Sequence, residues 1–394
     1  MGEYRTGFAA WGALSGASGD LSGWRLSGAA FSGGAIVLDP ARAAKGADPW
    51  PAGGYEGGSY HNGGSFLVGE AEGPVFEARF PFLEAVPSWR AETPAGTWIE
   101  VRLRVRQGGD WTPWYVHGVW ASGDEPVRRH SVTGQEDERA SVQTDKLSLK
   151  APAEALQIKV LLYRAEGATG EVAAPPRLRA ASVAYSTKPF PRGAAPEPSA
   201  PALPPVTIAG VPAYSQLAYP DGGNVWCSPT CLSMVLAHWE GEADGGSAAG
   251  VEALVRRTVA SVYDRVYGGH GNWSFCASYA GSLGYEARVA RFESLAAAEP
   301  WIAAGVPVIM SLSWNDEAGR PLTGAPIPKS SGHLTLLVGF DAKGDPVMNE
   351  PASKDPALVR RSYRRAELEA RWLESSGGTA YLICPPGRRV PELA

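Results

Sequence analysis

Alternating apolar and polar positions mark several strands in the first half of the chain. The run TWIEVRLRVRQ from Thr97 places four aliphatic side chains on one face and Glu and Arg side chains on the other. The runs ALQIKVLLYR from Ala155 and LRAASVAYS from Leu178 repeat this period of two, which is typical of half-buried strands. Many short strands without a helical period predict an all-β sandwich of jelly-roll type. The Gly- and Ser-rich residues 1–75 are expected to be loops with a few edge strands of the same domain.

The second half of the chain shows a helical period instead. The stretches SPTCLSMVLAHWE, VEALVRRTVASVYD and SFCASYAGSLG predict three helices, and SLAAAEPWIAAG a fourth that Pro300 should kink or split. Strands are expected at VPVIMSLSW, HLTLLVGFD and DPVMNEP, followed by a helix at RRAELEARWLESSGG and a last strand at TAYLIC. Helices followed by an antiparallel sheet predict an α+β fold.

A stretch rich in proline and alanine separates the two halves. Residues 189–205 read PFPRGAAPEPSAPALPP, with no periodic apolar pattern, which predicts a semi-rigid extended linker. We therefore expect a β-sandwich domain over residues 1–188 and an α+β domain over residues 206–394.

Composition excludes several classes of function. The 394 residues carry a formal net charge of −5 without a Lys/Arg stripe, which disfavours nucleic acid as a partner. No run of about 18 apolar residues predicts a membrane span, and the N-terminus lacks a secretory-signal pattern. The four cysteines form no CxxC pair, so neither a metal site nor a disulfide scaffold is expected. No cofactor motif of the P-loop type is present.

Aromatic residues of the first half allow two interpretations. They could stack on the sugar rings of a polysaccharide or cell-wall ligand, or they could fill the sandwich core, the commoner fate of tryptophan. The residues concerned are Trp89, Trp98, Trp111, Trp114, Tyr115 and Trp120.

One cysteine stands where a nucleophile needs to be. In WCSPTCLSMVL, Pro229 suits a first helical turn and Ser228 is expected to cap it, so Cys227 lies at the helix N-terminus. Free N–H groups and the positive end of the helix dipole favour a thiolate there, and the thiolate is the attacking species. Cys231, one turn later, is interpreted as a core residue.

The general base is expected to be a histidine from the second half. His238 lies about three turns along the same helix and His270 in the glycine-rich loop YGGHGNW, whereas His333 opens a buried strand that can hold it rigidly. The next strand offers Asn349 and Glu350 to orient the imidazole, but adjacent strand residues face opposite ways, so only one can serve. Upstream, the Gln216 side-chain amide and the Cys227 backbone N–H could form an oxyanion hole.

These segments together resemble a known enzyme family. The order VPAYSQ, WCSPTCLSMVL and SGHLTLLVGFDAKGDPVMNEPA is similar to papain-type cysteine peptidases related to the bacteriocin-processing, double-glycine-leader enzymes, some bacterial members of which carry a β-rich N-terminal domain. The resemblance implies a papain-like fold and a cysteine peptidase, in which Gln216 is the oxyanion glutamine, Cys227 the nucleophile, His333 the base and Glu350 the acidic third member.

Two departures from the family pattern keep alternatives open. Ser228 replaces the usual glycine after the cysteine, and Glu350 replaces the usual Asp, so Asn349 could orient His333 as in Cys-His-Asn sites. The alternative function is a papain-fold protein that is inactive, or that transfers an acyl group to an amine, and that binds cell-wall or peptide ligands.

A glycine-rich loop is the expected substrate contact. Glycines in Gly268–Trp273 allow close backbone approach, so we expect this loop to border the active-site cleft, with Trp273 lining the groove and His270 taking no part in acid–base chemistry. Trp226, beside the nucleophile, is a further predicted substrate contact. The aromatic-rich first half, the linker and the resemblance favour a location outside the bacterial cytoplasm, whereas the absent signal favours the cytoplasm.

Overall fold

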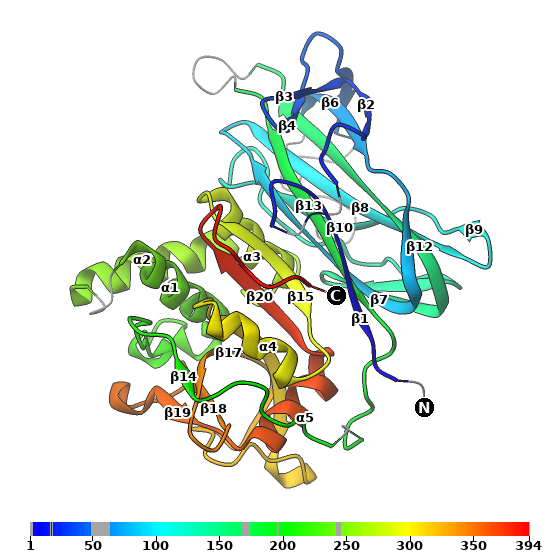
Figure 1. Cartoon of the computed structure of the whole chain (residues 1–394). Helices are drawn as coiled ribbons and strands as arrows, with labels where there is room; N and C mark the ends of the chain where they lie inside the picture. The colour runs from blue at the N-terminus through cyan, green and yellow to red at the C-terminus, as the bar shows by residue number, and fades with distance from the viewer. Residues whose placement is uncertain are drawn as a thin grey trace. The chain divides into compact units, whose positions relative to one another are not determined.

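The chain forms two compact units. The computed structural model describes residues 3–15, 17, 19–48, 64–167, 174–194, 197–241 and 246–393. Unit 1 comprises Met1–Thr6, Lys188–Val262 and Tyr285–Ala394, and unit 2 comprises Gly7–Thr187 and Tyr263–Gly284 (Figure 1). The chain therefore passes between the units more than once, and each unit is built from segments far apart in the sequence.

Unit 2 is built on one antiparallel sheet. Among the described residues its strands are β1 (Thr6–Gly12), β2 (Arg25–Ser27), β3 (Ala29–Ser32), β4 (Ala35–Leu38), β5 (Ala44–Ala47), β6 (Ser65–Glu72), β7 (Phe76–Glu92), β8 (Thr97–Gln107), β9 (Asp110–Trp111), β10 (Tyr115–Trp120), β11 (Ala140–Gln143), β12 (Lys146–Ala165) and β13 (Arg177–Ser186). The main path runs β10-β8-β12-β7-β13-β4-β3. Off this path, β1 pairs with β13, β9 with β8, and β6 and β11 with β12, while β2 and β5 pair with β6.

The all-β expectation for the first half is confirmed, but its division into two sheets is not. The long strand β12 pairs with β7 over its first half and with both β8 and β6 over its second half, which joins the strands into one sheet nearly closed into a barrel. The three alternating runs of the sequence lie in β8, β12 and β13, whereas the edge strands before residue 49 were not individually predicted. The part of the Gly-rich stretch at 49–63 lies outside the described residues.

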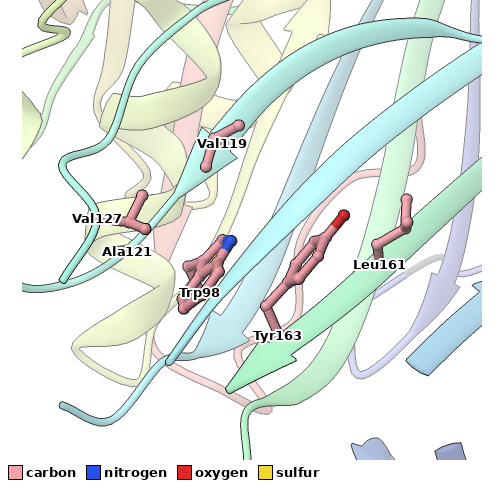
Figure 2. Close-up of a cluster of buried hydrophobic side chains, with 6 residues drawn as sticks. All are labelled: Trp98, Val119, Ala121, Val127, Leu161 and Tyr163. Carbon is pink, nitrogen blue, oxygen red and sulfur yellow. The ribbon is translucent and has the colours of Figure 1, made fainter. Parts of the chain in front are cut away.

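Most of the six aromatic residues considered as candidates for sugar stacking are core residues. Trp89, Trp98, Trp120 and Tyr115 are buried, and Trp98 stacks on Tyr163 with ring centroids 5.1 Å apart. Figure 2 shows these two rings side by side in a cluster completed by Val119, Ala121, Val127 and Leu161. Trp98 precedes Ile99 and therefore lies on the face of β8 opposite to the four aliphatic side chains, where this cluster buries it.

Only Trp111 and Trp114 of this set are half-buried, and both contact an arginine. The guanidinium carbon of Arg104 lies 4.7 Å from the ring centroid of Trp111 and 4.4 Å from that of Trp114. This arrangement is a cation–π pair on each ring. A role in stacking on sugars can therefore rest on these two rings alone among the six.

A segment from the second half of the chain packs inside unit 2. The helix α3 (Trp273–Ser282) lies along β7, where the ring of Phe275 contacts Trp89 and Trp120 at centroid distances of 6.2 and 5.4 Å. Gly118 permits this approach, since a Cβ atom there would lie 2.7 Å from the Phe275 ring. The helix thereby completes the hydrophobic core of the β unit.

Two buried aspartates hold this segment in unit 2. The carboxylate of Asp145 accepts hydrogen bonds from the backbone N–H groups of Trp273 and Ser274, at the start of α3. The carboxylate of Asp264 accepts one from the Ser131 N–H at 3.0 Å and one from the Asn272 side chain at 2.9 Å. Carboxylates at a helix N-terminus satisfy N–H groups that have no partner within the helix.

Unit 1 is an α+β unit around a second antiparallel sheet, as the sequence predicts. Among the described residues the strand order is β15-β20-β16-β17-β18-β19, with β14 paired to β17. The strands are β14 (Val206–Thr207), β15 (Glu286–Arg291), β16 (Val308–Asn315), β17 (Lys329–Phe340), β18 (Pro346–Asn349), β19 (Arg360–Ser362) and β20 (Thr379–Cys384). The helices are α1 (Cys227–Glu240), α2 (Ala248–Val262), α4 (Leu295–Ala303) and α5 (Arg365–Ser376), with short 3-10 turns η3 (Gln216–Ala218), η4 (Gly223–Val225), η5 (Asp316–Ala318) and η6 (Pro356–Leu358).

The helices follow the predicted periodicity with one difference. The helix α1 is buried on all sides from Ser228 to Ala237 and packs against β17 and α2, as expected of a central helix. The helix α4 runs through Pro300 as one element instead of splitting. It has only nine residues, and the proline removes the N–H of a single helical hydrogen bond.

The stretch expected to be a linker is bonded to unit 1 over part of its length. The N–H and hydroxyl of Ser199 donate to the carboxylate of Glu369 at 2.9 and 2.6 Å. The N–H groups of Ala202 and Leu203 donate to Glu299, which also pairs with Arg365 at 2.7 Å. Buried charged side chains thus fix an extended segment that carries no secondary-structure signal of its own.

Candidate active site

The thiol of Cys227 lies at the N-terminus of a buried helix. Cys227 is the first residue of α1 and Trp226 is its N-cap residue, two positions before the cap expected at Ser228. The hydroxyl of Ser228 instead lies 3.2 Å from that of Tyr381, inside unit 1. The first N–H groups of a helix have no partner within it, and the positive end of the dipole favours an anion. The backbone around Cys227 is therefore suited to a thiolate.

A hairpin brings His333 and Glu350 together. The strands β17 and β18 pair so that Leu336 lies opposite Asn349, which places Glu350, just after β18, close to His333. The prediction that His333 opens its strand is wrong, because β17 begins at Lys329 and His333 lies inside it. His333 Nε2 and Glu350 Oε1 are 2.6 Å apart, and both side chains are buried. The edge of the Trp314 ring contacts the imidazole at a centroid distance of 5.3 Å.

The carboxylate of Glu350 has two further hydrogen-bond donors. Its Oε1 accepts from the backbone N–H of Ala352 at 2.9 Å, and its Oε2 accepts from the hydroxyl of Tyr363 at 3.1 Å. A carboxylate fixed by several donors holds the imidazole in one orientation. Three groups therefore fix the glutamate that replaces the usual aspartate.

The charges of Cys227 and His333 are coupled. Burial alone would raise the pKa of Cys227, but the hydrogen bond to His333 and its positive charge lower it below its ordinary value. Burial would lower the pKa of His333, but the negative charge of Glu350 and the bond to Cys227 raise it to about 10. Because Nε2 faces Glu350, the other ring nitrogen, Nδ1, remains for the sulfur. These directions favour a thiolate–imidazolium pair at neutral pH.

The neighbouring Asn349 makes different contacts. Its side-chain amide donates to the carbonyl of Pro212 at 2.8 Å and accepts from Arg360 at 3.0 Å. Side chains at adjacent strand positions point to opposite sides, so the amide of Asn349 and the carboxylate of Glu350 contact different groups. Of the two, Glu350 is the residue in contact with His333.

The side chain of Gln216 is buried in the turn that precedes Cys227. Its Nε2 donates to the carbonyl of Gly223 at 2.6 Å, and its backbone N–H donates to the carbonyl of Pro351 at 2.9 Å. The second bond ties the Gln216 turn to the residue after Glu350. One hydrogen of the amide nitrogen is used by Gly223, and a carboxamide NH₂ group has a second to offer.

The predicted substrate contacts lie in different surroundings. The Trp226 ring is largely buried against Tyr219, at a centroid distance of 5.7 Å, whereas the preceding Val225 is 59% exposed. Trp273 and His270 belong to unit 2, where the Trp273 N–H donates to Asp145 and the ring of His270 contacts that of Tyr263. Burial lowers the pKa of His270 to about 4. Their predicted place beside Cys227 stays a prediction.

Sequence reasoning missed Tyr363 and Arg256 as neighbours of the site. Tyr363 follows β19, and its contact with Glu350 depends on how β18 and β19 pair. Arg256 lies on α2 and contacts the turn before Cys227 through Asp221. Neither residue belongs to a local motif, and no sequence signal separates them from the other tyrosines and arginines of the chain.

Comparisons with known proteins identify the family of each half of the chain. The model of the Peptidase C39 N-terminal domain matches residues 14–186, and that of the Peptidase C39-like family matches residues 208–380. No curated protein matches the chain. No helix in the described parts of the chain is long and apolar enough to cross a membrane. The protein belongs to the peptidase C39-like family of cysteine peptidases, whose substrates are peptides, and carries the N-terminal domain found with it.

Proposed function

We propose that this protein hydrolyses a peptide or amide bond with Cys227 as the nucleophile, His333 as the proton carrier, Glu350 as the residue that orients it, and Gln216 as an oxyanion donor. The observation that carries the proposal is Cys227 at the start of a helix, with its charge coupled to His333, which is hydrogen-bonded to the buried Glu350. A nucleophile, a base and an orienting group in hydrogen-bond contact are the common arrangement of acyl-transfer sites.

The reaction follows from the charges at the site. The Cys227 thiolate attacks the carbonyl carbon, and the carbonyl electron pair moves to oxygen, where the Gln216 amide and the Cys227 N–H can stabilise it. The imidazolium of His333 gives its proton to the leaving nitrogen as the carbon–nitrogen bond breaks, which leaves an acyl-thioenzyme. Neutral His333 then takes a proton from water, whose oxygen attacks the thioester and releases the acid and the thiolate.

Labelling of Cys227 tests the proposal directly. Iodoacetamide at neutral pH is expected to alkylate Cys227 far faster than the buried Cys231, Cys276 and Cys384. Cys227→Ala should abolish cleavage of a panel of peptides and wall peptides by the full chain. Equal labelling of the four thiols, or equal cleavage by wild type and Cys227→Ala, would contradict the proposal. The panel run with and without an added amine separates hydrolysis from acyl transfer.

Two finer proposals concern the partner and the location. We infer a polysaccharide or cell-wall ligand for unit 2 from the half-buried rings of Trp111 and Trp114, which present apolar faces beside charged groups. The same ligand would place the protein outside the cytoplasm. Sedimentation of the full chain with purified cell wall, compared with Trp111→Ala, tests the ligand, and cell fractionation tests the location. No binding to wall material would contradict both.

A further inference from the structure

The turn between Gln216 and Cys227 requires a glycine at position 223. The Gly223 N–H donates to the Tyr219 carbonyl at 2.8 Å, and the Trp226 N–H donates to the Gly223 carbonyl at 3.1 Å. A Cβ atom on Gly223 would lie 1.9 Å from the Gln216 carbonyl oxygen, so another residue could not be placed here without moving the turn. The proposed oxyanion donor and nucleophile are thus the two ends of one tight turn.

A single side chain from another helix contacts this turn at several points. Arg256 of α2 donates from Nη1 and Nη2 to the two carboxylate oxygens of Asp221, at 2.7 and 3.2 Å. Its guanidinium carbon lies 5.7 Å from the ring centroid of Tyr219 and 5.8 Å from that of Trp226. Its Nε donates to Glu252, one helical turn earlier, at 2.7 Å.

The guanidinium is suited to this place in a way that other cations are not. Its planar fork pairs with both oxygens of Asp221, while its face can lie against aromatic rings. The bond to Glu252 fixes the arginine to its own helix. Arg256 therefore connects α2 to the turn at positions between Gln216 and Cys227.

We propose that Arg256 is a positioning residue that holds the Gln216–Cys227 turn so that the Gln216 amide and the Cys227 N–H converge on one oxyanion. This inference rests on the proposed function and extends it to a residue outside the reacting set. The His333–Glu350 pair is supported separately by Ala352 and Tyr363. Loss of Arg256 should therefore weaken oxyanion binding without changing the reactivity of the thiolate.

Two probes separate these effects without a known substrate. Iodoacetamide reports the thiolate, because displacement at a saturated carbon forms no oxyanion. A dipeptide aldehyde reports the oxyanion donors, because Cys227 adds to its carbonyl and the oxygen that gains the electron pair sits among them. Its affinity is measured by protection of Cys227 from iodoacetamide.

Arg256→Gln in the full chain is expected to weaken aldehyde binding about tenfold, a part of the loss seen when an oxyanion donor is removed outright. The alkylation rate should stay within about twofold, since the charge pair is intact. Arg256→Lys should lose nearly as much aldehyde affinity, and Asp221→Asn combined with Arg256→Gln should add no further loss. Arg257→Gln, an exposed arginine on the same helix, is the matched control and should change neither value.

Three results would overturn the inference. First, the Arg256→Gln variant could bind the aldehyde as tightly as the Arg257→Gln variant does. Second, its alkylation rate could fall together with its aldehyde affinity, and this joint loss would indicate general loosening of the unit. Wild type could also be alkylated at Cys227 yet bind no aldehyde, which would leave no oxyanion arrangement to position. Failure of the proposed function looks different, because Cys227 of wild type would then show no preferential alkylation.

Discussion

The two units treat a buried histidine in opposite ways. In unit 1 the imidazole of His333 contacts the carboxylate of Glu350, and that charge with the bond to Cys227 outweighs burial and raises the pKa to about 10. In unit 2 the imidazole of His117 is equally buried, but its Nδ1 contacts only the backbone carbonyl of Asp145, at 3.1 Å. Burial then dominates and lowers the pKa of His117 to about 4.

The difference shows what makes a buried histidine chemically useful. Burial alone disfavours the charged form, so His117 is a neutral core residue at physiological pH. A carboxylate partner reverses the balance and keeps His333 charged beside a thiol. Depth of burial therefore does not identify the catalytic histidine, whereas its charged partner does.

Removing the imidazole of His333 should have the largest effect on the rate. His333→Ala takes away both the proton carrier and the charge that stabilises the thiolate, so we expect kcat for peptide cleavage to fall about a hundredfold or more. His270→Ala should leave the maximal rate within about tenfold, a change below about 1.4 kcal/mol in the barrier. Steady-state kinetics on the best peptide of the panel measures both.

His270 is the matched comparison because it is a buried histidine whose pKa is lowered by burial, as for His117. If His270→Ala lost a hundredfold and His333→Ala lost little, the catalytic pair proposed here would be wrong. Circular dichroism of each variant verifies that the fold is retained.

Much of the fold follows from local patterns. The strand over Thr97–Gln107 and the helix opening at Cys227 are visible because their periods persist over many residues. Closure of the first half into one sheet was not predictable, since it depends on β12 pairing with different strands along its length. Packing of α3 in unit 2 depends on Asp145, a residue 128 positions away in sequence from Trp273, and no local signal encodes such a contact.

The site shows the same division between local and non-local information. Cys227 stands at a helix end that the sequence reveals, whereas His333 lies inside β17, which begins four residues earlier than the sequence indicated. The register of β17 and β18 decides whether Asn349 or Glu350 contacts His333. The alternation of side chains shows only that one of the two residues faces His333, not which one. Tyr363 and Arg256 contact the site through tertiary packing alone, so they could not be read from the sequence.

Removing the negative charge of Glu350 should shift the pKa of His333 downward, toward that of His117. Glu350→Gln keeps a hydrogen-bond acceptor but removes the charge that raises the pKa of His333, so that pKa should fall. The pKa of Cys227 should rise, because His333 lowers it by more than the charge of Glu350 raises it, and neutral His333 no longer stabilises the thiolate. We expect the rate at neutral pH to fall about tenfold or more. The acidic limb of the pH dependence of iodoacetamide alkylation should move to higher pH, because less thiolate is present.

Asn349→Ala is the control for this prediction. The Asn349 amide is bonded to Pro212 and Arg360, so its loss should lower stability and leave the alkylation profile in place. A profile that moves in Asn349→Ala but not in Glu350→Gln would reassign the orienting role to Asn349.

Unit 2 contains a second buried group whose titration opposes that of His117. Asp145 is buried at the start of α3, and burial raises its pKa to about 7 despite hydrogen bonds from Trp273 and Ser274. The nearby charge of Asp264 acts in the same direction. A raised pKa means that the folded state binds this proton more tightly than the unfolded chain does. Its contribution to stability is therefore present below the unfolded pKa of about 4 and lost as the pH rises through about 7.

Asp145→Asn should have the smallest effect on the rate and a clear effect on the pH dependence of stability. Asparagine keeps an oxygen for the N–H groups of α3 but does not titrate, so kcat at neutral pH should be unchanged. The free energy of unfolding of the variant relative to wild type should rise by a few kcal/mol between pH 4 and 8, because only wild type loses stability as Asp145 ionises. His117→Asn should show the reverse sign: its lowered pKa gives wild type stability above about 6.5 that is lost as the pH falls toward 4. Urea unfolding followed by tryptophan fluorescence measures both, and a difference between Asp145→Asn and wild type that is constant with pH would show that Asp145 is not the buried acid inferred here.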